Sequence, residues 1–517
     1  MGSSTAYDGL GRPINTFADS ELGLLTTSIA YLSGFQKSVT NPRGFATTTS
    51  YQTFDEPSES AIATTAAPEG MSVAIGRDVF GKPTSITRSG AYYGSGPASV
   101  TRSYVYDINQ RLCKTVELET GATIQAYDAA NNIAWRASGL GLTSTASCDT
   151  ASAPAASKVA YTYDARNRLT GTGFGDGSPS IGRSYTPDGL PAVVTSSGTT
   201  WYYYYNKRRL LVQETLNFDG SQYWGIGWDY NPNSHLDQLR YPDGAAVPYA
   251  PNALGEATQV GAYASGVSHH PNGAVASYTL GNGIVHSLTQ NTRGLPLVNR
   301  DAGVMQDLYA FDANGNVNAI TDQQEGVSTR AMGYDALDRL TAANAPSVWG
   351  TASYRYDALG NLKTSIVGGR SSDHIFNASN RLETINTNGV YTGYAYDAQG
   401  NITGRGTQGF YFDQGNRMTL ATGVASYIYD GHGRRTSTVN VNGGYRKEAY
   451  SQSGQMLFGQ TQQGMVVRDT HYVYLGGKLI AEDGTAGVQY VHTDALGSPV
   501  ARTNSGAGLL TRTRYEP

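Results

Sequence analysis

One stretch beyond the middle of the chain reads Tyr354-Arg355-Tyr356-Asp357-Ala358-Leu359-Gly360-Asn361-Leu362. In an extended strand, Tyr354 and Tyr356 lie on one face and Arg355 lies on the other, because side chains alternate. Asp357 followed three positions later by Gly360 is typical of a type I turn that a left-handed residue closes. The stretch therefore predicts the tip of a β-hairpin.

The same pattern recurs at intervals of roughly 16 to 24 residues, a spacing that indicates a repeat architecture. The third position after the Asp holds Gly, Asn or Asp in nearly every copy, and these residue types tolerate positive φ. Gln110 is an exception. The predicted turn residues in the most regular copies are Asp312, Gly315, Asp335, Asp357, Gly360, Asp397, Gly400, Asp430 and Gly433.

Between residues 185 and 294 proline turns replace the Asp. They are Thr186-Pro187-Asp188-Gly189, Asn231-Pro232-Asn233-Ser234 and His270-Pro271-Asn272-Gly273. Proline at the second turn position presets φ, so we expect the same hairpins here.

Bulk composition excludes several classes of protein. The chain has 517 residues, which exceeds the usual single-core domain, and a net charge of -4, which gives no general affinity for nucleic acid. Its 63 glycines suit a chain with many turns. The two cysteines, Cys113 and Cys148, could pair or stay reduced. We find no apolar run long enough to span a bilayer and no signal-peptide pattern at the N-terminus.

Near its end the chain changes character, with His492-Thr493-Asp494-Ala495-Leu496-Gly497-Ser498-Pro499 and a last Arg514-Tyr515-Glu516-Pro517. Together with the Tyr-Asp repeats, this segment resembles the RHS/YD-repeat family of bacterial polymorphic toxins, Tc toxin shell subunits and teneurins. His492, Asp494, Leu496, Gly497, Ser498 and Pro499 match the family's C-terminal signature, which is structural there.

The resemblance implies an all-β fold in which a long antiparallel sheet of hairpins spirals into a hollow shell around a C-terminal toxin. In the family, a Tyr-Asp-Pro segment leads into a self-cleaving core, whereas this sequence has Glu516 in place of the Asp and ends at Pro517. We therefore expect the closing segment, the protease and the cargo to be absent from this sequence.

We expect residues 1–517 to form one repeat array. Within it, residues 5–103 carry degenerate copies, residues 104–470 carry clearer ones, and residues 471–517 begin the C-terminal signature. The expected function is structural, namely encapsulation and delivery of a toxin or effector domain of the same polypeptide. Secretion machinery or surface glycans are further candidate partners, and the full-length protein should be secreted or attached to the cell surface.

Four groups of residues could carry chemistry, and a structural role is favoured for each. The run from Asp312 to Asn316 resembles a calcium loop, but it lacks the Gly and the bidentate Glu of a real one. The run from Trp201 to Arg209 could stack nucleic acid bases or glycans. His269, His270 and His286 lack ligand partners at the spacing of a zinc site.

His492 and Asp494 suggest a catalytic pair, but residues two apart in a strand share a face in any case. We expect no enzyme activity, no cofactor, no metal and no nucleic acid partner. The main alternative function is a glycan- or protein-binding adhesin with exposed tyrosines. Paired β-propellers are a third possibility, because two repeats approximate one blade.

Overall fold

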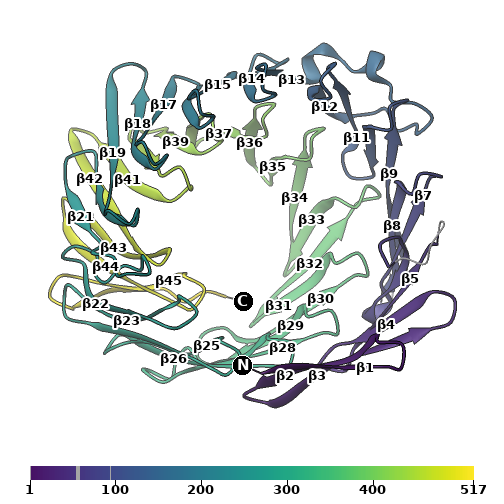
Figure 1. Ribbon diagram of the computed structural model, residues 1–517, viewed down its shortest axis with the longest axis horizontal. Coiled ribbons are helices and arrows are strands. Elements are labelled where there is room, and N and C mark those ends of the chain that lie inside the picture. The colour runs from purple at the N-terminus through teal and green to yellow at the C-terminus, as the bar shows by residue number, and fades with distance from the viewer. Residues whose placement is uncertain (1, 54–58, 93–94, 517) are drawn as a thin grey trace.

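The chain folds almost entirely into antiparallel β-strands, as the computed structural model shows for residues 2–53, 59–92 and 95–516 (Figure 1). Each strand pairs with the next one along the chain, which gives one sheet of 21 strands and a second of 25 strands. We call these sheets the first strip and the second strip. The all-β expectation is confirmed.

The strands of the first strip are β1 (Ser3–Tyr7), β2 (Pro13–Ser20), β3 (Gly23–Leu32), β4 (Gln36–Thr40), β5 (Ala46–Tyr51), β6 (Ile62–Ala66), β7 (Ser72–Arg77), β8 (Pro83–Tyr92), β9 (Ser95–Tyr106), β10 (Leu112–Glu117), β11 (Gly121–Tyr127), β12 (Ile133–Leu140), β13 (Lys158–Tyr163), β14 (Leu169–Phe174), β15 (Ile181–Tyr185), β16 (Pro191–Ser196), β17 (Thr199–Tyr205), β18 (Leu211–Phe218), β19 (Gln222–Tyr230), β20 (Leu236–Arg240) and β21 (Ala246–Pro248). Short 3-10 helices are η1 (Pro68–Gly70), η2 (Thr150–Ser152) and η3 (Ala155–Ser157).

The strands of the second strip are β22 (Ala264–His269), β23 (Val275–Leu280), β24 (Val285–Gln290), β25 (Pro296–Asp301), β26 (Met305–Phe311), β27 (Val317–Asp322), β28 (Arg330–Tyr334), β29 (Leu340–Ala345), β30 (Gly350–Tyr356), β31 (Leu362–Val367), β32 (Arg370–Phe376), β33 (Leu382–Thr387), β34 (Val390–Tyr396), β35 (Ile402–Arg405), β36 (Gln408–Phe412), β37 (Met418–Ala421), β38 (Ala425–Tyr429), β39 (Arg435–Asn440), β40 (Tyr445–Tyr450), β41 (Met456–Gln463), β42 (Val466–Leu475), β43 (Lys478–Gly484), β44 (Gly487–Thr493), β45 (Pro499–Thr503) and β46 (Leu509–Arg512).

Each Tyr-Asp motif forms the predicted turn. In the copy between β30 and β31, one carboxylate oxygen of Asp357 accepts hydrogen bonds from the backbone N–H groups of Leu359 and Asn361. The φ angles of Gly360, Gly400 and Gly433 are 89°, 95° and 78°, the positive values that the turn assignment predicts. Each of these hairpins also carries a β-bulge just after the turn, which curves the sheet.

The turn with Gln110 in place of a glycine and the proline-containing turns adopt the same conformation. Gln110 has a φ of 61°, which matches the glycines that replace it elsewhere. In the proline turns, Gly189, Ser234 and Gly273 have φ of 97°, 70° and 82°. The backbone therefore imposes one turn geometry even where the side chain does not favour it.

In several motifs the tyrosine directly before the Asp or Thr of the turn connects its hairpin to the preceding one. The hydroxyl of Tyr396 donates to the carbonyl of Leu382, the first strand residue after the preceding turn, and Tyr334 donates in the same way to Val317. The residue that follows the preceding turn places its side chain over the ring of this tyrosine. The guanidinium carbon of Arg381, for example, lies 5.4 Å from the ring centroid of Tyr396. The spacing of Tyr, Asp, Gly and Arg thus encodes both the turn and its link to the next repeat.

The two cysteines, left open by the sequence, form a disulfide. Cys113 on β10 is bonded to Cys148 in the segment between β12 and β13, with 5.4 Å between the Cα atoms. The adjacent Lys114 is buried and pairs with Asp149. Both contacts tie this Ala/Ser-rich insertion to the strip.

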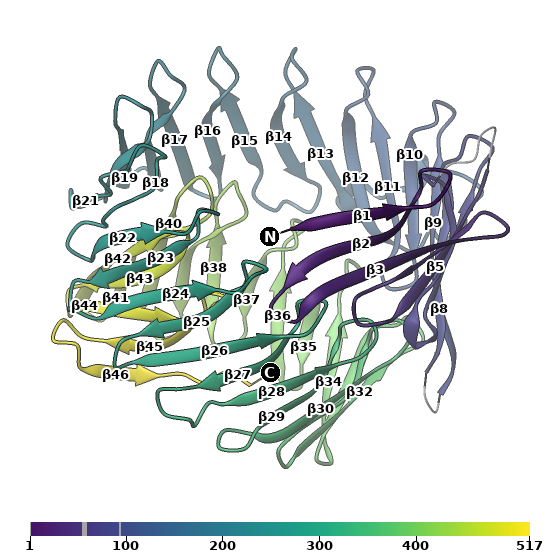
Figure 2. The same cartoon turned by 60° about the horizontal axis from the view of Figure 1, so that its bottom comes forward.

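The curved ribbon winds round on itself and leaves a central opening (Figures 1 and 2). We call the row of turns that carries the Tyr-Asp motifs the YD rim, and the row of turns at the other ends of the strands the return rim. Along the seam, the YD rim of the second strip lies against the return rim of the first strip, as in the ion pair of Arg293 with Glu21.

The turn geometry makes a testable prediction. Gly360→Val should destabilise the protein by about 1–2 kcal/mol, because a β-branched residue is strained at a φ of 89°. Gly393 is the matched control, since it lies within β34 at an ordinary φ and a Cβ atom there would meet no described atom within 4 Å. The midpoint of urea unfolding should fall for Gly360→Val and should stay level or rise for Gly393→Val. An equal loss in both variants would contradict the turn assignment.

Candidate functional site

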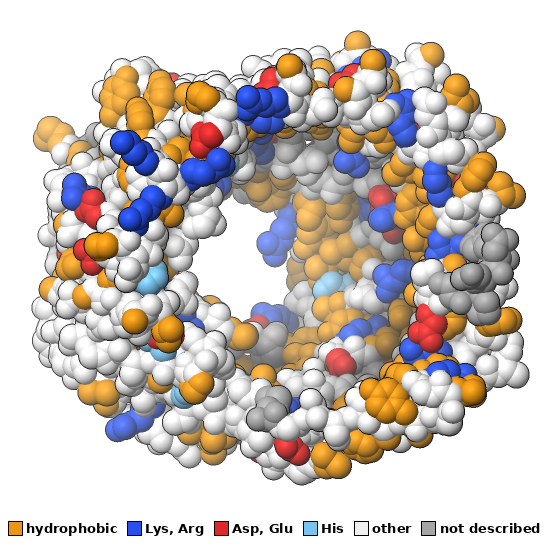
Figure 3. Space-filling model, viewed as in Figure 1, with side chains coloured by type: hydrophobic (Ala, Val, Ile, Leu, Met, Phe, Trp, Pro, Cys, Tyr) orange, Lys and Arg blue, Asp and Glu red, His pale blue; other side chains and the backbone are white. Residues whose placement is uncertain are grey.

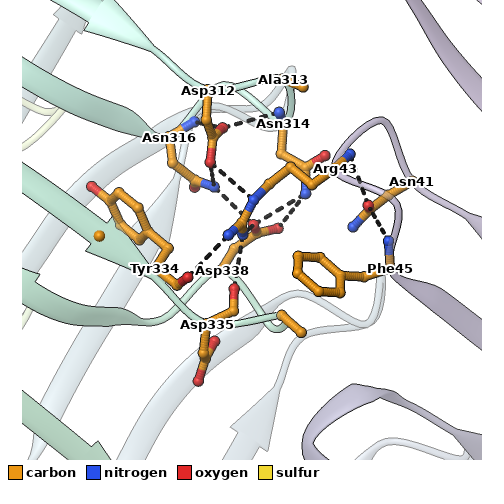
Figure 4. A network of polar contacts seen from close by, with 12 residues as sticks. Asn41, Arg43, Phe45, Asp312, Ala313, Asn314, Asn316, Tyr334, Asp335 and Asp338 are labelled. Carbon is orange, nitrogen blue, oxygen red and sulfur yellow. Dashed lines mark hydrogen bonds and ion pairs between the residues drawn. The ribbon is translucent and has the colours of Figure 1, made fainter.

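The most elaborate constellation of side chains is the seam where the two rims meet. One end of it is built around Arg43, in the turn between β4 and β5 (Figure 4). Its guanidinium lies 3.2 Å from the carboxylate of Asp312 and 2.5 Å from that of Asp338. It also donates to the backbone carbonyls of Tyr334 and Asp335, at 3.0 and 2.8 Å. One cation from the first strip thereby joins two successive YD turns of the second.

Further along the seam, small residues let the two rims approach closely. A Cβ atom at Gly90 would lie 2.3 Å from the Cβ of Ala358, and one at Gly139 would lie 2.7 Å from the backbone carbonyl of Ala398. Ala358 and Ala398 each follow the Asp of a YD turn. The position after the Asp is therefore the contact position, and glycines on the return rim receive it.

The middle of the seam is buried and polar. The indole N–H of Trp201 donates to the carboxylate of Asp430 at 2.9 Å, across 229 residues of sequence. Asp430 also pairs with Arg434 at 3.0 Å and is fully buried. Next to it, Tyr203 hydrogen-bonds the Nε2 atom of His432 at 2.7 Å. Burial lowers the pKa of His432 and so favours the neutral ring. The neutral ring can accept a hydrogen bond from the tyrosine hydroxyl at Nε2.

A buried carboxyl group lies beside this polar cluster. Glu214 on β18 is opposite Tyr203 in the strand register and has no exposed surface. Burial raises its pKa to about 8, with Arg434 acting in the opposite direction. Glu214 is therefore protonated at neutral pH.

Towards the C-terminal end of the seam, the margins of the two strips overlap face to face and bury the largest hydrophobic cluster of the described residues. The ring of Trp224 on β19 contacts that of Phe458 on β41, with 4.8 Å between centroids. Tyr241 donates to the carbonyl of Tyr472 at 3.0 Å. This overlap supplies the apolar core that a single layer of strands lacks.

The C-terminal signature lies in this region, where the second strip overlaps itself. His492 is fully buried on β44, and its Nδ1–H donates to Asp301 at 2.9 Å. His286 donates to the other oxygen of Asp301 at 2.7 Å. Burial disfavours the charged carboxylate, but these two hydrogen bonds hold the pKa of Asp301 below its usual value. The Nε2 atom of His492 contacts the hydroxyl of Thr503 at 2.9 Å, so each polar atom of the ring has a partner.

The rest of the signature forms a YD-type turn. Asp494 accepts hydrogen bonds from the backbone N–H groups of Leu496 and Ser498, Gly497 has a φ of 92°, and Pro499 begins β45. Asp494 thus caps its own turn, while the partner of His492 is Asp301. His492 and Asp494 do not form a pair.

The other candidate groups from the sequence make contacts that stabilise the fold. Asp312 accepts hydrogen bonds from the backbone of its own turn and forms an ion pair with Arg43. Trp201 and Tyr203 are buried and cannot stack bases or glycans. Among the described residues no group of three or more His, Cys, Asp or Glu side chains is placed to hold a metal. Nor does any helix there have the length and apolarity needed to cross a membrane.

Sequence reasoning missed the residue that follows the positive-φ turn residue, although it recurs as Arg or Asn in many copies. Arg339 donates to Asp335 of its own turn at 2.7 Å and to the carbonyl of Asp357 in the next turn at 3.1 Å. Asn361 likewise links Asp357 to Asn380. These side chains connect consecutive turns along the YD rim.

Glu214 gives the seam a testable pH dependence. Its pKa of about 8 lies above the unfolded value near 4.5, so its folded form binds a proton that the unfolded form has lost. Stability relative to Glu214→Gln, which cannot ionise, should therefore fall as pH rises from about 4.5 to about 8, by about 5 kcal/mol. Melting temperatures of the two proteins at pH 4, 6 and 9 check this. A constant difference across that range would contradict the assignment.

Comparison with known proteins supports the same architecture. Residues 334–517 match the family model described as Teneurin YD-shell. No curated protein sequence matches the chain. Among solved structures, TcdB2-TccC3 without its hypervariable C-terminal region superposes with a TM-score of 0.70 at 12% identity, over 99% of this chain and 30% of that one.

The Tc holotoxin pore of Photorhabdus luminescens superposes with a TM-score of 0.61 at 10% identity, again over 99% of this chain and 30% of that one. The chain thus spans less than a third of the length of these structures. The family model matches residues 334–517, and the superpositions show that the chain as a whole has the fold of these shells, which supports the resemblance to the RHS/YD-repeat family seen in the sequence.

Proposed function

We propose that this chain is a wall segment of a shell that encloses a toxin or effector domain of the same polypeptide and helps to deliver it. The observation that carries the proposal is the sealed seam around an open interior. Figure 3 shows the hollow through the middle of the molecule. Polar contacts join windings whose residues are about 190 to 290 positions apart in sequence, from Arg43 with Asp335 to His492 with Asp301.

The physical argument concerns protection. A protease cleaves a chain only where it can locally unfold, and a sheet whose strands are paired on both sides resists such unfolding. Domains inside a wall of this kind would be shielded until the wall opens. A shell role is structural, so we propose that this segment catalyses no reaction itself.

The full-length protein would act outside the cell that makes it, since delivery of an effector requires export. This part of the proposal is supported by the likeness to the Tc holotoxin pore, a toxin assembly. Secretion machinery or surface glycans would be its transient partners. The adhesin alternative is less supported, because exposed tyrosines such as Tyr204, Tyr223, Tyr391 and Tyr411 lie singly on different strands.

The test is limited proteolysis of the complete natural protein that contains this segment. We expect the shell and the enclosed domain to survive a broad protease together, whereas the same domain made alone is digested. The matched comparison is Trp201→Ala, which removes a buried seam contact and should expose the enclosed domain to cleavage sooner. Tyr411→Ala, at an exposed site on β36, is the control and should leave protection unchanged.

Loss of the downstream domain while the repeats stay intact would contradict enclosure. In that case, binding of the repeats to a glycan array would support the adhesin alternative.

A further inference from the structure

At one point of the seam, the return rim of the first strip is formed by a long connection and not by a tight turn. This insertion, residues 141–157, joins β12 to β13 (Figure 1). It lies beside the turn between β14 and β15, because a Cβ atom at Gly175 of that turn would clash with the carbonyl of Ala155. The two loops together form the surface that the second strip meets here.

The second strip places one YD turn against this surface. Gln414, directly after the Asp of the turn between β36 and β37, is buried, and its Nε2 atom donates to the carbonyl of Ala156 at 3.1 Å. Its Oε1 atom accepts from the backbone N–H of Asp176 at 3.3 Å, and its own backbone N–H donates to Ser178 at 3.2 Å. The position of the insertion therefore decides whether Gln414 keeps its partner at Ala156.

The insertion has little apolar contact to hold it in place. Of residues 141–157, all of which the structure describes, only Ala153 is buried, in a small cluster with side chains of β11 and β12. Lys114 reaches the insertion from β10, where it pairs with Asp149 and donates to the carbonyl of Ser144 at 2.6 Å. A buried ion pair that is exchanged for two hydrated charges gives little net stability, so this contact is a weak fastener.

The covalent fastener is the disulfide between Cys113 and Cys148. Cys113 is buried, whereas Cys148 is partly exposed on the insertion, so a dissolved thiol reaches the sulfur of Cys148 first. The thiolate of glutathione attacks that sulfur, the S–S bond breaks, and Cys113 leaves as a thiolate that takes up a proton. A second glutathione then displaces Cys148 from the mixed disulfide. Two glutathione molecules thereby supply two electrons and two protons and become one molecule of oxidised glutathione.

We propose that this disulfide is a redox-sensitive latch on the seam. In the oxidised state it holds the insertion against β10 and so keeps Ala156 in place for Gln414. Reduction by a small thiol such as glutathione frees the insertion, removes that partner from Gln414 and loosens the seam at the turn between β36 and β37. The latch responds to passage from an oxidising to a reducing compartment, where disulfides do not persist. It acts on the wall alone and requires no enclosed domain, so its failure would leave the proposed shell role intact.

Hydrogen exchange of the purified chain, read by mass spectrometry with and without reduced glutathione, tests the latch. Counting free thiols by alkylation shows when the disulfide has been reduced. We expect reduction to speed exchange about tenfold or more in two segments, residues 141–157 and residues 413–417, because both lose the contact that they share. Exchange in the turn around Gly360, elsewhere on the seam, should stay unchanged.

Two variants separate the latch from a general stabilising effect. The double variant Cys113→Ser with Cys148→Ser should show the fast exchange without glutathione and should not respond when glutathione is added; circular dichroism checks that its strands are intact. Gln414→Ala keeps the disulfide and should speed exchange at residues 413–417 only. A disulfide that resists glutathione, a reduced chain in which residues 413–417 stay protected, or faster exchange throughout both strips would each overturn the proposal.

Discussion

A ribbon one hairpin tall cannot bury both of its faces, and this constraint explains where the stability of the shell comes from. From β1 to β9, where the margins of the two strips do not yet overlap face to face, no described residue is buried. The largest apolar cluster lies where β16–β25 meet β40–β45. Winding is therefore the step that gives the sheet an interior, since burial of apolar area is the main favourable term in folding.

The repeat motif serves the local fold and the winding together. Asp357 satisfies the backbone of its turn, Gly360 supplies the positive φ, and the bulge that follows bends the strip. The neighbouring Ala358 is then presented to the other rim. One short motif therefore serves three purposes. Some of its residues form the turn, some link consecutive turns along the ribbon, and one contacts the other rim across the seam.

The local structure could be predicted from the sequence because each step depends on neighbouring residues. Turn position, strand alternation and the turn-forming role of Asp357 follow from residue spacing and φ preferences alone. The seam could not be predicted in this way. Arg43 looks like any turn residue, and nothing near Trp201 in the sequence indicates Asp430, 229 positions away. The register of the windings depends on accumulated curvature, which no single repeat reveals. For the same reason the sequence pointed to Asp494 as a partner of His492, whereas the winding of the strip brings Asp301 next to His492.

The most direct measurement of the wound seam is a double-mutant cycle between Trp201 and Asp430. The free energy of unfolding is measured for the wild type, Trp201→Phe, Asp430→Asn and the double variant. A hydrogen bond from an indole to a buried carboxylate predicts a coupling of about 1–3 kcal/mol, since each single variant breaks the same contact. Strictly additive losses would show that these residues do not touch in solution, and would contradict a shell closed by contacts between successive windings.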